Sequence, residues 1–101
     1  MSVLDETALA RRLASLPDWS GDSGRISRTV DLAGRRAETL QAKVMAVADE
    51  LNHHPVVEQQ GAALTFILWT HSAGGVTEKD LDLAKRIDEV IARGEQAAPE
   101  A

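Results

Sequence analysis

The chain has 101 residues, of which 44% are hydrophobic and 27% are charged, so it fits one compact globular domain with little room for a second. The formal net charge of −5 would repel phosphate backbones and argues against nucleic-acid binding, and the lack of cysteine excludes disulfides, thiolate nucleophiles and cysteine-ligated metal sites. Neither a signal peptide nor an apolar run of about 20 residues is visible, so we expect a cytoplasmic protein without membrane contact.

The N-terminal segment predicts a short helix. Asp5 is a good N-cap, and Leu9, Leu13 and Leu16 recur on one helical face. Pro17 would then end the helix.

A β-hairpin is predicted over about residues 18–32. Residues 21–24, with the sequence GDSG, are typical of a turn. Ile26, Val30 and Leu32 share one side of the second strand, and Trp19 is expected on the short first strand.

A second helix is predicted from about Arg35 to Asn52, because the apolar residues in this range recur with the helical period. Pro55 forbids its continuation, since a residue that precedes proline is pushed out of the α region. His53 and His54 are therefore expected at a helix-to-strand junction.

A second hairpin is predicted from the segments VVEQQ and ALTFILWT, joined around Gly61. Both faces of the latter strand are largely apolar, whereas a strand with one wet face should alternate polar and apolar residues. The chain has too few helices to cover both faces of the sheet. We therefore expect a homo-oligomer, in which another subunit covers one face.

The last helix is predicted to open at Thr77, with Asp80 as the partner in a short-armed capping box, and to end at Gly94. Residues 95–101 form a polar tail that we expect to be disordered. The order α-β-β-α-β-β-α predicts the α+β class: a four-stranded antiparallel sheet with helices packed on one face, in a single domain over residues 1–94.

All three histidines, His53, His54 and His71, fall at element boundaries that could meet at one end of the sheet. Taken singly, each could be an ordinary helix-end or loop residue. Together they could exchange protons with a substrate, or they could bind zinc with Asp49 or Glu50. Zinc is disfavoured, because the rings of adjacent histidines seldom reach one ion and the helical two-histidine spacing is missing. No serine lies in a recognisable nucleophile turn, so acid–base chemistry on a small molecule is favoured.

The segments DELNHHP and LWTHSAGGVTEKDLDLAKRIDEV resemble the signature of the pterin-4a-carbinolamine dehydratases. The resemblance is specific from Asp49 to about Val90 and colinear before that. It implies an α+β fold and a lyase that removes water from a 4a-hydroxytetrahydropterin to give quinonoid dihydropterin, in tetrahydrobiopterin biosynthesis and recycling. It also implies that no cofactor is needed, that the protein is a homodimer or homotetramer, and that an aromatic amino acid hydroxylase is a metabolic partner.

The resemblance also implies roles for individual residues. His53 and His71 would be the general acid and base, with His54 positioning the substrate, and Asp49 and Asp80 would be acidic supports. The full set comprises catalytic His53, His54 and His71, and substrate-binding Trp19, Asp49, Pro55, Thr70, Ser72, Ala73 and Asp80.

Two alternatives to an enzyme stay open. The same fold could serve as a non-catalytic dimerisation, assembly or coactivator-like module, or the histidines could form a metal-binding domain. A pure scaffold would have no physical reason to keep three histidines and both acidic positions, which favours the dehydratase.

Overall fold

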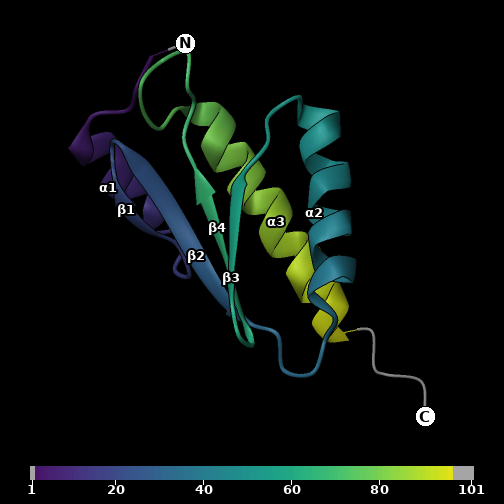
Figure 1. Ribbon diagram of the computed structural model, residues 1–101. Helices are drawn as coiled ribbons and strands as arrows, with labels where there is room; N and C mark the ends of the chain where they lie inside the picture. Colours follow the sequence, from purple (N-terminus) through teal and green to yellow (C-terminus); the bar gives the residue numbers. More distant parts are fainter. Residues whose placement is uncertain (1, 97–101) are drawn as a thin grey trace.

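A computed structural model describes residues 2–96 of the chain. Its elements are α1 (Glu6–Leu13), β1 (Ser20–Asp22), β2 (Arg25–Asp31), α2 (Ala37–Leu51), β3 (Val56–Gln60), β4 (Ala63–Leu68) and α3 (Glu78–Gln96) (Figure 1). This is the predicted order, so the α+β class is confirmed. Positions 97–101 of the predicted tail lie outside the described residues.

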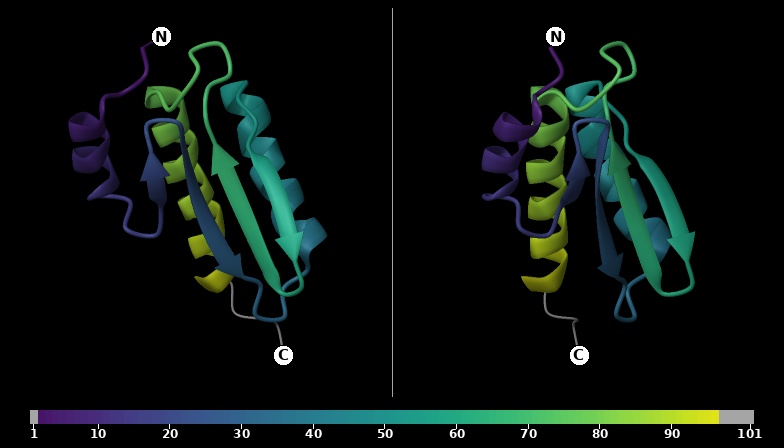
Figure 2. Two further views of the ribbon diagram at one scale, coloured as in Figure 1. Left: turned by 60° about the vertical axis from the view of Figure 1, so that its left-hand side comes forward. Right: turned by 90° about the vertical axis from the view of Figure 1, so that its left-hand side faces the viewer.

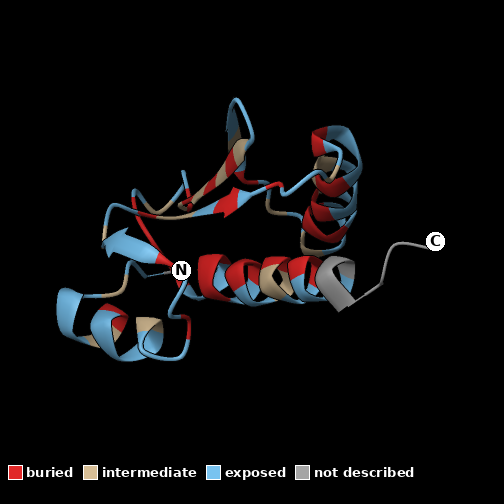
Figure 3. Cartoon of the chain, turned by 90° about the horizontal axis from the view of Figure 1, so that it is seen from below, coloured by how far each residue is buried: buried red, intermediate tan, exposed pale blue. Residues whose placement is uncertain are grey.

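The four strands form one antiparallel sheet in the order β1-β2-β4-β3. Helices α2 and α3 lie side by side on one face of the sheet, and α1 lies beyond β1 on the same side (Figure 2, Figure 3). None of the helices between residues 2 and 96 is long and apolar enough to cross a bilayer. Within the same residues, the other face of the sheet carries no helix.

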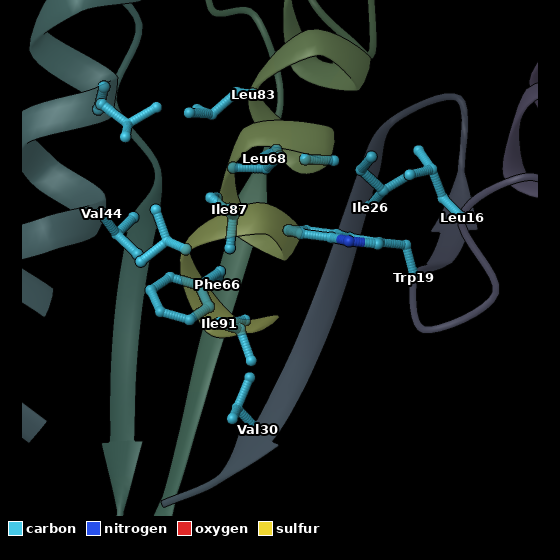
Figure 4. Packing of buried hydrophobic residues seen from close by; sticks show 14 of the residues in the cluster. Leu16, Trp19, Ile26, Val30, Val44, Phe66, Leu68, Leu83, Ile87 and Ile91 are labelled. Atoms are coloured by element: carbon cyan, nitrogen blue, oxygen red, sulfur yellow. The ribbon is translucent and has the colours of Figure 1, made fainter. Parts of the chain in front are cut away.

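The core lies between the sheet and the helices, because the periodicity of each element directs one apolar row toward it. Strand β4 alternates buried and half-buried residues along its whole length. Leu64 is fully buried in this core. The residues that fill its middle are Ile26, Val30, Val44, Phe66, Leu68, Leu83, Ile87 and Ile91 (Figure 4).

The first hairpin is tighter than the sequence predicted. Gly21 and Asp22 belong to β1, only Ser23 and Gly24 form the turn, and Trp19 precedes the strand instead of lying on it. The reason is local: the Asp22 carboxylate accepts hydrogen bonds from the backbone N–H of Gly24 at 2.8 Å and of Arg25 at 3.3 Å. These bonds stabilise a two-residue turn.

The predicted ends of two helices also differ from the observed ends. Helix α1 has Asp5 as its N-cap, as predicted, but it ends at Leu13, well before Pro17. Helix α3 continues through Gly94 to Gln96, so the predicted end at Gly94 is wrong. A single glycine costs a helix only about 1 kcal/mol, which does not suffice to end it.

Candidate active site

The end of α2 aims His53 and His54. Asn52 takes the left-handed conformation (φ 52°, ψ 43°), its N–H bonds to Asp49 O at 3.2 Å, and the N–H of His53 bonds to Ala48 O at 3.0 Å. This is a Schellman ending, and asparagine is among the few residues that adopt it readily. The helix therefore ends at Leu51 through Asn52, before Pro55 takes effect.

Thr70 and His71, which follow β4, point to opposite sides of the sheet. Because side chains alternate along a strand, the buried row of Leu64, Phe66 and Leu68 continues into Thr70, and the outer row continues into His71. The chain then turns back, and the Thr70 N–H bonds to Gly75 O at 2.9 Å. This turn and the α2–β3 junction lie at the same end of the sheet, as predicted (Figure 1).

A buried hydrogen-bond network holds His53. Its Nε2 lies 2.5 Å from Oδ1 of Asp80, which is fully buried at the start of α3. The other oxygen, Oδ2, accepts from the Thr77 N–H at 2.9 Å and from the Thr70 hydroxyl at 2.8 Å, and the Thr70 and Thr77 hydroxyls are 2.8 Å apart. The Asp80 carboxylate thus joins three elements, and its partners offset the cost of burying it.

The network fixes the direction of each hydrogen bond. Since the Thr70 hydroxyl donates to Asp80, the Thr77 hydroxyl must donate to Thr70, while the Lys79 N–H donates to Thr77 Oγ1 at 3.3 Å. A carboxylate only accepts, so Nε2 of His53 carries the proton and donates. The bond to Asp80 uses Nε2, so Nδ1 is the ring nitrogen with which His53, a lining residue of the cleft, could accept a proton.

His54 and Asp49 form a second, exposed pair. Their Nε2 and Oδ1 atoms are 2.6 Å apart, and the side chains are 50% and 73% exposed. A pair in contact with water contributes little to stability. It nevertheless limits the orientations of the His54 ring.

His71 lies on the outer side of the turn and is exposed. Its ring centroid is 4.6 Å from that of Trp69, with 38° between the planes, and the guanidinium carbon of Arg25 lies 5.1 Å from the Trp69 ring centroid. These distances are typical of aromatic and cation–π contacts.

The three histidines meet at one cleft of about 490 Å³, lined by Asn52, His53, His54, Trp69, Thr70, His71, Ser72 and Lys79. This volume is within the range of small-molecule sites. Among the described residues, no group of three or more His, Asp or Glu side chains could hold a metal ion.

The structure brings most of the predicted site residues to this cleft or directly behind it. Thr70 and Ser72 line the cleft. Asp80 and Asp49 lie behind His53 and His54 as their hydrogen-bond partners. Pro55 is buried next to His54 in the chain, and Ala73 is half-buried in the turn that carries His71.

Trp19 is not brought to the cleft. It is 4% exposed in the core, and its indole N–H donates to Asp88 on α3 at 2.8 Å (Figure 4). Asp88 also accepts from Arg28 on β2 at 2.5 Å. Trp19 therefore joins the first hairpin to α3. Its partner Asp88 lies further along this helix than Asp80, which binds His53.

Three residues that line the cleft were not among the predicted site residues: Asn52, Trp69 and Lys79. Asn52 could have been found from its tolerance of the left-handed conformation at a helix end. Trp69 could have been found from its spacing of two from His71, which places both on one side of an extended segment. Lys79 had no comparable signal.

Comparison with known proteins gives consistent matches over most of the chain. The model of the family described as Pterin 4 alpha carbinolamine dehydratase matches residues 2–90. A protein of Nocardia farcinica is 40% identical over 89 residues, which cover 87% of this chain and 94% of that protein. A protein of Chloroflexus aurantiacus is 39% identical over 92 residues, which cover 90% and 99%. Both bear the name "Putative pterin-4-alpha-carbinolamine dehydratase".

A similar fold has been solved for a protein of Brucella melitensis, described as a transcriptional coactivator/pterin dehydratase. The TM-score is 0.79 at 27% sequence identity, and the match covers 86% of this chain and 96% of that one. Family model, sequence relatives and fold agree over nearly the whole chain, which therefore belongs to the pterin 4 alpha carbinolamine dehydratase family.

Proposed function

We propose that this protein is a cytoplasmic lyase that removes water from a 4a-hydroxytetrahydropterin and gives the quinonoid dihydropterin. The reaction would follow a hydroxylase that releases the 4a-hydroxy compound, such as an aromatic amino acid hydroxylase, and would return the pterin to its recycling pathway. Family membership supports the substrate class. The cleft supports the chemistry, because three histidines line it and its volume is within the range of small-molecule sites.

In the proposed reaction, the substrate loses one proton from the ring nitrogen next to C4a and gains one at the 4a-hydroxyl. Nδ1 of His53 accepts the proton from nitrogen, and protonated His71 donates to the hydroxyl. The C4a–O bond then breaks, a double bond forms between C4a and the nitrogen, and water leaves. No electrons are exchanged with the protein, so the step needs only acid and base.

The two histidines are suited to different halves of this step. The cation that forms on His53 lies against the Asp80 carboxylate, which stabilises it in a site with little water. His71 is exposed and takes up a new proton from solvent, and His53 releases its proton to solvent through the cleft after the product leaves, which restores both rings for the next turnover. His54, held by Asp49, orients the flat bicyclic substrate.

The single observation that carries the proposal is the hydrogen-bonded chain His53–Asp80–Thr70–Thr77 at the base of the cleft. It uses Nε2 of His53 and so leaves Nδ1 for a substrate, in a cleft that two further histidines line. A histidine that only completes a helix end would not need a buried carboxylate behind it.

The test is the rate of 4a-hydroxytetrahydropterin dehydration, with the substrate generated by a hydroxylase in a coupled assay. We expect the wild-type protein to accelerate the reaction above its uncatalysed background, and His53→Ala to lose about 10²- to 10⁴-fold of that acceleration. Arg11→Gln, on the exposed side of α1, is the control and should keep the wild-type rate. Background rates from folded wild-type protein would overturn the proposal.

The alternative is a coactivator-like binding module, which the description of the Brucella melitensis protein favours. His71→Ala separates the two functions. An enzyme should lose dehydration while its oligomeric state is unchanged, whereas a scaffold would have no activity to lose.

We also propose that the chain self-associates as a homodimer or homotetramer. On the helix-free face of the sheet, Thr29 is exposed, Thr65 and Ile67 are only half-buried, and Val56 on the edge strand β3 is 39% exposed. Light scattering should give a mass of two or four times 10.9 kDa. The mass of a single chain would contradict this.

A further inference from the structure

The outer face of the sheet carries a row of three side chains in contact at its cleft end. In the antiparallel pairing of β2 with β4, Ile26 lies opposite Leu68, so one step further Arg25 lies opposite Trp69. Trp69 and His71 are two residues apart and share this face. The register of the sheet thus places Arg25, Trp69 and His71 in one row. The guanidinium carbon of Arg25 lies 5.1 Å from the Trp69 ring centroid, and the Trp69 and His71 ring centroids are 4.6 Å apart, so neighbours in the row are in contact.

The β1–β2 turn holds two features in place: the row of Arg25, Trp69 and His71, and the turn after β4 that carries His71. Arg25 follows the turn directly, and Ser23 within it accepts a backbone hydrogen bond from Val76 at 2.8 Å. Gly75 packs so closely that a Cβ there would lie 2.5 Å from Ser23 O. The segment from Trp69 to Val76 is therefore attached to the β1–β2 turn at its Val76 end and to Arg25, the first residue of β2, at its Trp69 end.

His71 differs from the other two histidines in how it is supported. His53 and His54 each bind a carboxylate through Nε2, which occupies one ring nitrogen. In the described part of the chain, the His71 ring makes no such bond and is in contact with Trp69 instead. This tilted ring contact is not a hydrogen bond, so it occupies neither nitrogen of the His71 ring.

We propose that Arg25 and Trp69 are positioning residues for His71. The Arg25 guanidinium holds the indole by a cation–π contact, and the indole holds the imidazole with one nitrogen free for the substrate and the other for proton exchange with solvent. This inference rests on the proposed dehydratase function for its kinetic consequence, but not for the geometry itself.

The geometry is tested by NMR on the His71 ring protons, which the nearby indole should shift by its ring current. We expect these shifts to move toward the values of an unstructured histidine in Trp69→Ala and in Arg25→Gln, and to return in part in Arg25→Lys, which restores the cation. Arg11→Gln, which also removes one positive charge, should leave them unchanged. Unchanged shifts in Arg25→Gln would overturn the proposal, whether or not the protein is an enzyme.

The kinetic test is a double-mutant cycle. The free energy of an exposed cation–π contact corresponds to about a 2- to 5-fold change in rate. Arg25→Gln should therefore lower kcat by about 2- to 5-fold and change KM little. In a His71→Ala background, Arg25→Gln should have no further effect, because the two residues act as one unit. An equal loss in both backgrounds would overturn the positioning role. Wild-type protein without dehydratase activity would instead reject the proposed function and leave the NMR result standing.

Discussion

His53 and His71 line the same cleft, but the chain supports them in opposite ways. His53 is 11% exposed and is bonded to Asp80, a buried carboxylate that also accepts hydrogen bonds from Thr70 and Thr77. His71 is exposed and lies against Trp69 on the outer side of a turn. One histidine is held by the interior of the fold, and the other is held by a surface contact.

This difference indicates how activity and stability are linked at each position. The residues that orient His53 also cap α3 and join it to β4, so a change there should affect both the reaction rate and the free energy of unfolding. The residues around His71 carry little of the core, so a change there should affect the rate alone. The following predictions test that separation, beginning with the largest expected effect.

Asp80→Asn should have the largest effect. Both partners of Oδ2 are donors, so the new amide must place its oxygen there and its NH₂ toward His53. Nε2 of His53 must then accept, and the proton moves to Nδ1, which can then no longer accept a proton. We expect a rate loss of roughly 10²- to 10⁴-fold, as for other carboxylate–histidine pairs forced into the wrong tautomer.

The same variant should lower the free energy of unfolding by about 1–3 kcal/mol, because it disturbs a buried hydrogen-bond network. Chemical denaturation gives this value, and it also verifies that the protein is folded where the rate is measured. A folded Asp80→Asn protein with the wild-type rate would contradict the assigned role of Nδ1.

His71→Ala should give the second largest rate loss, about 10²-fold, because it removes the proposed acid. Since the side chain is exposed, the free energy of unfolding should change by no more than about 0.5 kcal/mol. Rate and denaturation measured on the same preparation check this. A stability loss as large as that of Asp80→Asn would remove the contrast between the two histidines.

Thr77→Ala should act mainly on stability. It removes the N-cap hydroxyl of α3 and the bond to Thr70, at a cost of about 0.5–2 kcal/mol. The rate should fall less than in Asp80→Asn, because the Asp80–His53 bond stays in place. Thr77→Ser keeps the hydroxyl and is the matched control, with stability close to wild type.

Asp49→Asn should have the smallest effect. The pair with His54 is exposed, so its loss should cost no more than about 1 kcal/mol of stability. If His54 orients the substrate, KM should rise while kcat changes little. A fall in kcat comparable to that of His71→Ala would instead assign His54 to the chemical step.

Much of the fold could be predicted from the sequence because each element carries a regular apolar pattern with clear breaks. The four strands and three helices follow from the apolar segment around Phe66, the helical rows of α2 and α3 and the residues of the turns. Two of the errors, at Trp19 and Gly94, arise where one local preference competes with another. The turn geometry of Asp22 shortened the first hairpin loop, and the length of α3 outweighed one glycine.

For the candidate site, the sequence predicted which histidines meet but not how they are held. The Thr77–Asp80 spacing was recognised as a helix cap, and only the tertiary structure adds His53 to the same carboxylate. From the sequence, Trp69 belongs to the apolar strand ALTFILWT, with no indication of a contact to His71. Arg25 carried no signal, because its contact with Trp69 depends on the register between β2 and β4.

The most direct test of the account is the ¹⁵N NMR spectrum of the His53 ring in the wild-type protein, recorded at a pH where the ring is neutral. Protonated and unprotonated ring nitrogens have well-separated shifts, so the spectrum identifies the tautomer without an assay. The hydrogen bond to Asp80 predicts a proton on Nε2 and an unprotonated Nδ1. A proton on Nδ1 would contradict the account, because His53 could not then accept a proton from a substrate in the cleft.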